Sequence, residues 1–354
     1  MKPRGTKKGR LPLKRRSELS RKGISSYTHI IQGFCYSSST MPELPEVQTT
    51  VNGLQKVLPN LKIKDVWTDW PKTVKGNSFQ KFKHEIIGEK ISAVKRRAKN
   101  ILINISGGKT ILIHMKMTGH LLYGKYNQIP YSNVLENIGI RKNSKKTNNL
   151  RWVPADKKSP LNDPFNRFIH FVFTLSNGKH LAFSDMRKFG KLALEKTSAL
   201  PHSPHLSHLG PEPLEKKFTL KKFSERLLKK PNGKIKTVLM DQVIISGIGN
   251  IYSDEMLFLA GIHPETKVSK IKINGIAKLF SAMKKVLKKG IDFGGDSMSD
   301  YRNINGERGK FQEKHNAYQK TGSRCAKRGC FGVIIKKKIG GRSAHFCSIH
   351  QKLY

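Results

Sequence analysis

The hydrophobic pattern of this 354-residue chain changes period near residue 209, and this change limits the folds that the chain can adopt. Between residues 63 and 183, short apolar runs alternate with polar residues and are separated by Gly, Asn and Lys turns. Such alternation predicts β-strands. After residue 209 the apolar residues recur at helical spacing. The sequence therefore predicts an α+β chain with a strand-rich domain followed by a helical one.

In the first half, a helix is predicted from Glu46 to about Leu58, because apolar residues recur there every three to four positions. Six apolar runs behind it are predicted to form strands: Ile63–Trp67, Ile91–Val94, Ile101–Ile105, Thr110–His114, Ile169–Leu175 and His180–Phe183. Residues 124–166 interrupt this pattern with Asn, Lys, Pro and Ser. They are predicted to form an inserted, mobile surface loop.

The second half begins with the sequence Leu209–Leu214, which is predicted to link the domains. Four helices are expected after it: Phe218–Lys229, Ile235–Gln242, Ile251–Ala260 and Gly275–Lys289. The glycine-rich turn 246–250 opens the third helix, and such turns either bind phosphate or only mark tight packing. Residues 290–311 lack periodicity, and a long irregular stretch inside a compact domain indicates function.

Three of the four cysteines gather near the C-terminal end with a histidine. Their spacing is Cys325-x4-Cys330-x16-Cys347-x2-His350. Three soft ligands and one imidazole suit a single tetrahedral zinc ion with no open position, hence a structural site. Val333–Lys338 and Ser343–Phe346 are predicted to form a hairpin between the ligand pairs, with Arg342 near its tip.

The chain carries 68 Lys and Arg against 24 Asp and Glu, a formal net charge of +44. This excess points to a polyanionic partner, most simply nucleic acid, although a lysine-biased composition explains part of it. No apolar run approaches the ~20 residues of a membrane span, so an intracellular protein without a membrane partner is expected. Residues 1–40 are strongly basic, and three interpretations stay open: an organelle-targeting leader, a nucleic-acid tail, or an extension before the true start at Met41.

Eight segments in order resemble the formamidopyrimidine-DNA glycosylase / endonuclease VIII (Fpg/Nei) family. They are Met41–Val47, Arg96–Lys99, His114–Gly119, Asp185–Gly190, Leu209–Leu214, Leu239–Pro264, Gly294–Gln312 and Arg342–His350. The Pro-Glu-Leu-Pro-Glu-Val form is closer to formamidopyrimidine-DNA glycosylase. The resemblance implies an N-terminal β-sandwich with a leading helix at 41–208, a helix–two-turn–helix domain at 209–313 and a zinc-finger hairpin at 314–354.

The resemblance also implies a bifunctional DNA glycosylase and AP lyase acting as a monomer on double-stranded DNA. It would remove oxidised purines (8-oxoguanine, formamidopyrimidines) or act at abasic sites. Pro42 would attack C1′, Glu43 would act as general acid, and Lys99 would contact phosphate and handle protons during β-elimination. Arg342 would grip flanking phosphates and assist δ-elimination. By itself, Pro42 is more simply read as a helix-start proline with a favourable φ.

An enzyme that acts on a base must take it out of the stack, and the hole then needs filling. The resemblance assigns this to Met117, Arg187 and Phe189, although composition alone favours a buried core position for Phe189. The loop 294–311 would cap the everted base, and its glycines predict a mobile lid.

Lys236 and Asn250 would hold phosphate by the same resemblance. Phe168 stands where many family members have a DNA-contacting histidine, and His170 lies two residues further on. The DNA contact is therefore assigned to His170, or the nearby Arg167 takes it over. The chemistry requires Pro42 to be the first residue of the working enzyme, because an amide nitrogen is no nucleophile. The alternative is a non-catalytic DNA-binding protein whose leader blocks Pro42. A ribosome-associated zinc protein would explain the charge but not the motifs.

Overall fold

The protein is described by a computed structural model that covers residues 41–130, 150–298 and 300–353. One sheet has the strand order β1-β9-β10-β6. Its strands are β1 (Ile63–Thr68), β6 (Gly119–Gly124), β9 (Ile169–Leu175) and β10 (His180–Asp185). A second sheet has the order β2-β11-β5-β4-β3. Its strands are β2 (Val74–Lys75), β3 (Ile91–Arg97), β4 (Asn100–Ile105), β5 (Lys109–His114) and β11 (Lys191–Lys196).

The two sheets bury one common hydrophobic core, to which β1, β9 and β10 contribute from one side and β3, β4 and β5 from the other. The side chains of β4 alternate: Ile101 and Ile103 enter this core, whereas Leu102 enters a smaller cluster on the other face. The predicted β-sandwich and the predicted hairpin of β4 and β5 are therefore confirmed.

The insertion differs from the prediction. Its described ends are not a loop but a hairpin in which β7 (Tyr126–Pro130) pairs with β8 (Leu150–Pro154). The indole of Trp152 contacts that of Trp67 in β1, with ring centroids 6.1 Å apart. Leu161 is also buried, so tertiary packing orders a segment whose composition indicates a loop. Residues 131–149 lie outside the described part of the chain.

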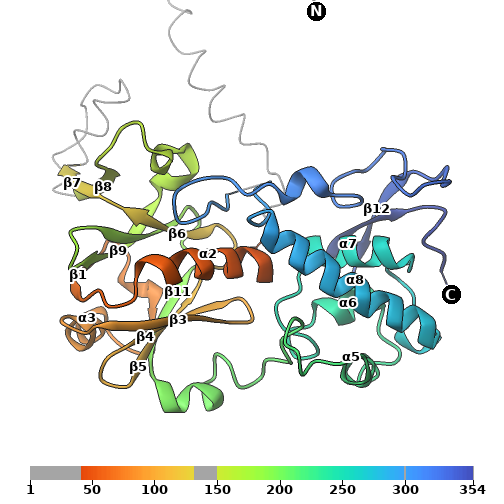
Figure 1. Cartoon of the computed structure of the whole chain (residues 1–354), viewed down its shortest axis with the longest axis horizontal. Helices are drawn as coiled ribbons and strands as arrows, with labels where there is room; N and C mark the ends of the chain where they lie inside the picture. The colour runs from red at the N-terminus through yellow and green to blue at the C-terminus, as the bar shows by residue number, and fades with distance from the viewer. Residues whose placement is uncertain (1–40, 131–149, 299, 354) are drawn as a thin grey trace, which may run out of the picture. The chain divides into compact units, whose positions relative to one another are not determined.

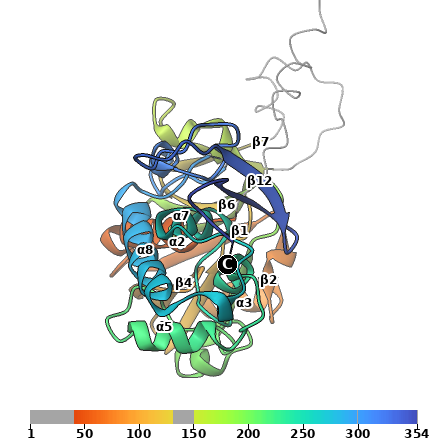
Figure 2. The same cartoon turned by 90° about the vertical axis from the view of Figure 1, so that its right-hand side faces the viewer.

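Helix α2 (Leu44–Val57) joins two cores, because Leu44 packs in the helical core while Val47 and Val51 pack in the sandwich core. Figure 1 shows α2 between the strands and α8. The helices of the second half are α5 (Leu220–Leu227), α6 (Ile235–Met240), α7 (Asn250–Ala260) and α8 (Ile273–Asp292). All four agree with the predicted ranges to within a few residues, and α7 lies against α8 (Figures 1 and 2).

The last hairpin consists of β12 (Ile334–Ile339) and β13 (Arg342–Cys347), and β13 packs against α7. Helix α3 (Phe79–Ile86) covers β1. Short 3-10 helices are η1 (Pro71–Thr73), η2 (Pro160–Asn162), η3 (Pro164–Arg167), η4 (Thr197–His202), η5 (Val268–Lys270) and η6 (Phe311–Lys314). Within the described ranges, no helix combines the length and hydropathy of a membrane span. The domain boundaries after residues 208 and 313 stay predictions.

Candidate active site

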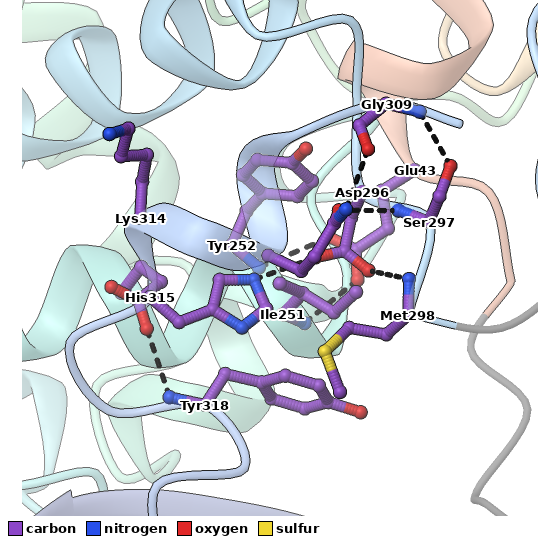
Figure 3. A network of polar contacts seen from close by, with 12 residues as sticks. Glu43, Ile251, Tyr252, Asp296, Ser297, Met298, Gly309, Lys314, His315 and Tyr318 are labelled. Carbon is purple, nitrogen blue, oxygen red and sulfur yellow. Dashed lines mark hydrogen bonds and ion pairs between the residues drawn. The ribbon is translucent and has the colours of Figure 1, made fainter. Parts of the chain in front are cut away.

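The carboxylate of Glu43 lies at the N-terminus of helix α7. It accepts hydrogen bonds from the backbone N–H groups of Gly249 (2.7 Å), Ile251 (2.8 Å) and Tyr252 (3.4 Å) (Figure 3). The glycine-rich turn thus binds a carboxyl group, as a helix N-terminus binds an anion, but the group belongs to a side chain of the same chain. Burial raises the pKa of Glu43, while the Lys99 charge and these N–H donors oppose the rise.

Two glycines make this approach possible. A Cβ at Gly249 would lie 2.4 Å from Cδ of Glu43, and one at Gly247 would lie 2.7 Å from the Leu44 side chain. Gly247 also has a φ of +88°, which disfavours other residues. Pro42, next to Glu43, is buried directly before α2. The turn therefore holds the start of α2, and with it Pro42, against the helical half.

Glu46 forms a second layer beneath Glu43. Its carboxylate accepts from the backbone N–H of Glu43 (2.8 Å), the hydroxyl of Tyr252 (2.6 Å) and the backbone N–H of Asp296 (2.7 Å). The Glu43 and Glu46 pair is a capping box, which also fixes where α2 begins. Burial and the neighbouring charge of Glu43 raise the pKa of Glu46 to about 8.

Lys99 follows strand β3 and is buried, with 7% of its surface exposed. Burial lowers the pKa of Lys99, and the charge of Arg342 lowers it further, while Glu43 and Glu46 act in the opposite direction. Arg342 itself is exposed at the start of β13, where it pairs with Ile339. The structure thus brings together Glu43, Lys99 and Arg342 from three distant parts of the chain.

Glu212 holds the segment that carries Lys99. Its carboxylate pairs with Arg96 (2.5 Å) and Arg97 (3.0 Å) and accepts from the backbone N–H of Ala98 (2.5 Å). Ser246, beside the glycine-rich turn, donates to the same carboxylate (3.4 Å). Burial alone would raise the pKa of Glu212, but Arg96 outweighs it and the pKa is lowered.

Met117, Arg187 and Phe189 lie together. The Arg187 guanidinium is 4.6 Å from the centroid of the Phe189 ring, and one of its nitrogens is 3.5 Å from the Met117 sulfur. Phe189 is 44% exposed, so the interpretation of this residue as core is wrong. The buried carboxylate of Asp185 orders this turn by accepting from the backbone N–H of Gly190 (2.7 Å) and from the hydroxyl of Thr118.

Three residues next to the predicted site residues adopt left-handed backbone conformations. They are Ala98 (φ +53°), Lys116 (φ +58°) and Lys188 (φ +54°). Non-glycine residues with positive φ are uncommon, and they concentrate where the surrounding structure imposes a functional geometry. Each one directly precedes a predicted site residue, which is Lys99, Met117 or Phe189 in turn, and its backbone conformation sets the position of that residue.

Two residues that are predicted to contact DNA are buried and paired within the chain. Lys236 is fully buried, and its ammonium pairs with Asp254 at 2.6 Å. His170 is 6% exposed, and its Nδ1 is 2.8 Å from Asp69. Long-range partners thus occupy the polar atoms of both side chains, and their contact with DNA stays a prediction. Asn250 opens α7, and its buried Oδ1 has no hydrogen-bond partner in the described structure.

The described residues of the loop 294–311 pack against the rest of the protein, and its role as a mobile lid stays a prediction. Ile304 packs in the sandwich core, and the Tyr301 hydroxyl donates to the carbonyl of Glu46 (3.1 Å). Asp296, near the start of the loop, and His315, four residues after its end, contact each other through Oδ2 and Nε2 at 2.7 Å, with both side chains 1% exposed (Figure 3). The loop therefore has contacts near its start, in its middle and just after its end.

The four predicted metal ligands lie close together in the structure. The ligand atoms of Cys325, Cys330, Cys347 and His350 lie within 4.8 Å of one another. The sulfurs of Cys330 and Cys347 are 3.6 Å apart, close to the edge of about 3.8 Å that a tetrahedron with metal–sulfur bonds of ~2.3 Å requires. The Nε2 atom of His350 lies 3.1 Å from the Phe258 carbonyl, which leaves Nδ1 for a metal. The cluster fits a metal ion.

Several residues of the site are not predicted from sequence. Glu46 has the three-residue spacing of a capping box, which is a usable signal. Glu212 and the Arg96-Arg97 pair lie within two segments that carry the family resemblance. Nothing in the sequence near either segment indicates that the two are in contact. The Asp296–His315 pair has no sequence signal at all.

The chain was compared with known families, proteins and structures. A family model of the formamidopyrimidine-DNA glycosylase N-terminal domain matches residues 41–192, and one of the formamidopyrimidine-DNA glycosylase H2TH domain matches residues 209–302. The formamidopyrimidine-DNA glycosylase of Pelotomaculum thermopropionicum is 37% identical over 88% of this chain and 100% of its own length. That of Bacillus subtilis is 34% identical over 87% of this chain and 98% of its own length.

Solved structures give the same result. A complex between Lactococcus lactis Fpg and DNA containing an abasic site matches with a TM-score of 0.70 and 30% identity, over 88% of this chain and 99% of the other. A complex of a mutant of the same Fpg with DNA containing Fapy-dG matches with a TM-score of 0.71 and 30% identity, over 88% and 100%.

Proposed function

Because this chain belongs to the formamidopyrimidine-DNA glycosylase family of DNA repair glycosylases, we propose that it is a bifunctional glycosylase and AP lyase for oxidised purines in double-stranded DNA. The observation that carries this proposal is the position of Glu43. Its carboxyl is held by the N-terminus of α7, next to Pro42 and near Lys99. A proton donor is thus built beside the nitrogen that would attack the sugar.

In the first step, the nitrogen of a free Pro42 forms a bond to C1′ and gives up its proton. The bond from C1′ to the base breaks, and the base leaves with the electron pair and takes up a proton. Glu43 protonates the ring oxygen as the C1′–O4′ bond opens, which leaves a positively charged iminium between Pro42 and C1′. The raised pKa of Glu43 supports this role, since the carboxyl must carry a proton to donate it.

In the second step, the iminium acts as an electron sink. Loss of a proton from C2′ expels the 3′-phosphate, and a second elimination expels the 5′-phosphate. The lowered pKa of Lys99 suits proton transfer as well as phosphate contact. Arg342, exposed at the start of β13, would bind the flanking phosphates. Met117, Arg187 and Phe189 would fill the hole left by the everted base. Their mutual contacts support this role, since they join the half-buried Met117 to the exposed Arg187 and Phe189 on a neighbouring turn.

Zinc is the metal we propose for the cysteine cluster. Cys325, Cys330, Cys347 and His350 would hold it. A bound zinc ion supplies no chemistry here, because four protein ligands leave no open position. The residues around it position β13, and so the direction of Arg342.

Pro42 must be the first residue for this mechanism, and the family match begins at Met41. Three chains test the proposal: one that starts at Pro42, one that retains Met41 and the full chain from Met1. Borohydride should trap a covalent complex with abasic DNA only for the first chain. Absence of an adduct from the chain that starts at Pro42 would contradict the enzymatic function.

A non-catalytic DNA-binding protein is the second candidate, since the peptide bond to Met41 makes the nitrogen of Pro42 an amide in the full chain. The intact mass of the protein purified from its native cells decides between the two. A mass that begins at Pro42 supports the enzyme, and one that retains residues before Pro42 supports the binding protein.

A further inference from the structure

Two adjoining cavities next to the proposed site are lined by lysines. The first measures about 330 Å³, and its lining includes Lys75, Lys99, Lys116 and Lys191. The second measures about 370 Å³, shares all of these except Lys99 and adds Lys188. Among the described residues, no Asp or Glu lines either cavity. Together the cavities make a basic groove that leads away from Lys99, and we call it the lysine groove.

The lysines of the groove are close enough to repel one another. Burial and the charge of Lys191 lower the pKa of Lys116, and the charge of Lys116 contributes to the lowered pKa of Lys99. His114 lies among them, and burial together with these charges lowers its pKa to about 3. His114 is therefore neutral, and its Nδ1 accepts from the backbone N–H of Lys116 (3.0 Å). An anion in the groove would relieve this repulsion.

The backbone holds these lysines in place. Strand register sets Lys191 opposite His114 and Lys75 opposite Ala193. Lys116 lies in the strained turn after β5, with a φ of +58°. Paired strands carry Lys75 and Lys191, and a turn fixed by β5 carries Lys116, so the groove is pre-organised for a ligand with a fixed spacing of negative charges, such as a nucleic-acid backbone. Trp70 and Phe189 line the second cavity and give it an apolar side.

We propose that Lys75, Lys116 and Lys191 form a phosphate subsite that holds the DNA backbone beyond the phosphate contacted by Lys99. The proposal rests on the proposed function, since it takes DNA as the ligand. Because the shared chemistry is phosphate, a free phosphate ion is the other source of the same charge. The subsite lies outside the reacting atoms, so its loss weakens binding and leaves the chemical step unchanged.

The salt dependence of binding measures the subsite. We expect Lys191→Met to reduce the slope of log K against log salt by about 0.9 for a duplex with a tetrahydrofuran abasic analogue, and Lys116→Met/Lys191→Met by up to about 1.8. Lys196→Met is the matched control, because Lys196 is an exposed lysine at the other end of β11 and lines neither cavity. Equal slopes for Lys191→Met and Lys196→Met would overturn the proposal.

A second measurement identifies the phosphate. We would measure the affinities of the wild type and of Lys191→Met for a set of duplexes. In each duplex one phosphate is replaced by a neutral methylphosphonate. At one position the replacement should weaken the wild type but not the variant, because the two changes remove the same contact. Independent penalties at every position would overturn the assignment to DNA.

Inorganic phosphate distinguishes the other source. One outcome would make the groove a site for free anions and overturn the proposal. In it, phosphate raises the Tm of the wild type but not of Lys191→Met, and the salt dependence of DNA binding is the same for both proteins. Binding to the tetrahydrofuran duplex needs no reaction at Pro42. A failed borohydride trap with altered slopes would therefore refute the chemistry and keep the subsite, and a successful trap with equal slopes would do the reverse.

Discussion

Glu46 is a buried carboxyl whose ionisation the fold opposes. Burial and the charge of Glu43 raise its pKa from 4.5 to about 8. Between these pH values the unfolded chain loses a proton that the folded chain retains. The free energy of unfolding therefore decreases as pH rises, by at most about 1.4 kcal/mol per pH unit, and levels off above the folded pKa.

Glu46→Gln removes this titration. The free energy of unfolding of the variant minus that of the wild type should increase from pH 5 to pH 8 and stay constant at pH 9. Urea unfolding at each pH measures it. Glu225→Gln, an exposed carboxyl on α5, is the control and should give a difference that does not change with pH. A flat difference for Glu46→Gln would mean that Glu46 is ionised in the folded protein.

At the scale of elements, the buried Asp296–His315 contact joins the start of the loop 294–311 to a residue four positions after its end. Removing one partner of a buried pair leaves an unpaired polar group, so His315→Gln should loosen the loop. If the loop caps the everted base, excision of 8-oxoguanine should decrease about tenfold to 100-fold, since small misplacements are costly. Trapping on abasic DNA, which has no base to cap, should change less than twofold.

Excision rates, abasic trapping and hydrogen exchange of residues 296–311 measure this prediction together. Lys230→Met is the control, because Lys230 and Asp241 form an exposed pair of 2.5 Å that contributes little. A parallel loss of excision and trapping in His315→Gln would show general damage to the site rather than a role for the loop.

At the scale of the whole molecule, Glu212 connects the strand that carries Lys99 to the turn that holds Glu43. Glu212→Ala leaves Arg96 and Arg97 without their carboxylate, and we expect a loss of about 2–3 kcal/mol in the free energy of unfolding. Glu215→Ala, in the same segment but 44% exposed in its pair with Lys217, should cost less than about 1 kcal/mol. Equal costs in denaturant unfolding would count against this connection.

The zinc cluster is the other long-range support. Metal analysis should find one zinc per chain, and Cys347→Ser should lose it, because the Cys347 sulfur is buried among the ligands. Chelation should lower the Tm and weaken DNA binding, since the hairpin carries Arg342. Ser348→Ala, next to the cluster, should keep the metal. A chain without metal and with an unchanged Tm under chelation would contradict the zinc assignment.

The sequence by itself determined the features that depend on local pattern. Alternating apolar residues specify strands such as β4 and β5, because side chains of a strand point to opposite faces. Helical spacing specifies α2, α7 and α8 in the same way. The Cys and His spacing specifies the metal cluster, and the Met41–Val47 segment indicates the family. Each of these signals lies within one stretch of the chain, the longest of which is the 26 residues from Cys325 to His350.

Only the tertiary structure decided which partner each polar group finds. The N-terminus of α7 can bind any anion, and the fold supplies Glu43 from 206 positions away rather than a DNA phosphate. The resemblance assigns Lys236 and His170 to DNA contacts. In the structure both side chains are buried, and Lys236 pairs with Asp254 and His170 with Asp69. Electrostatic pairing depends on distance in space, and local periodicity carries no information about it.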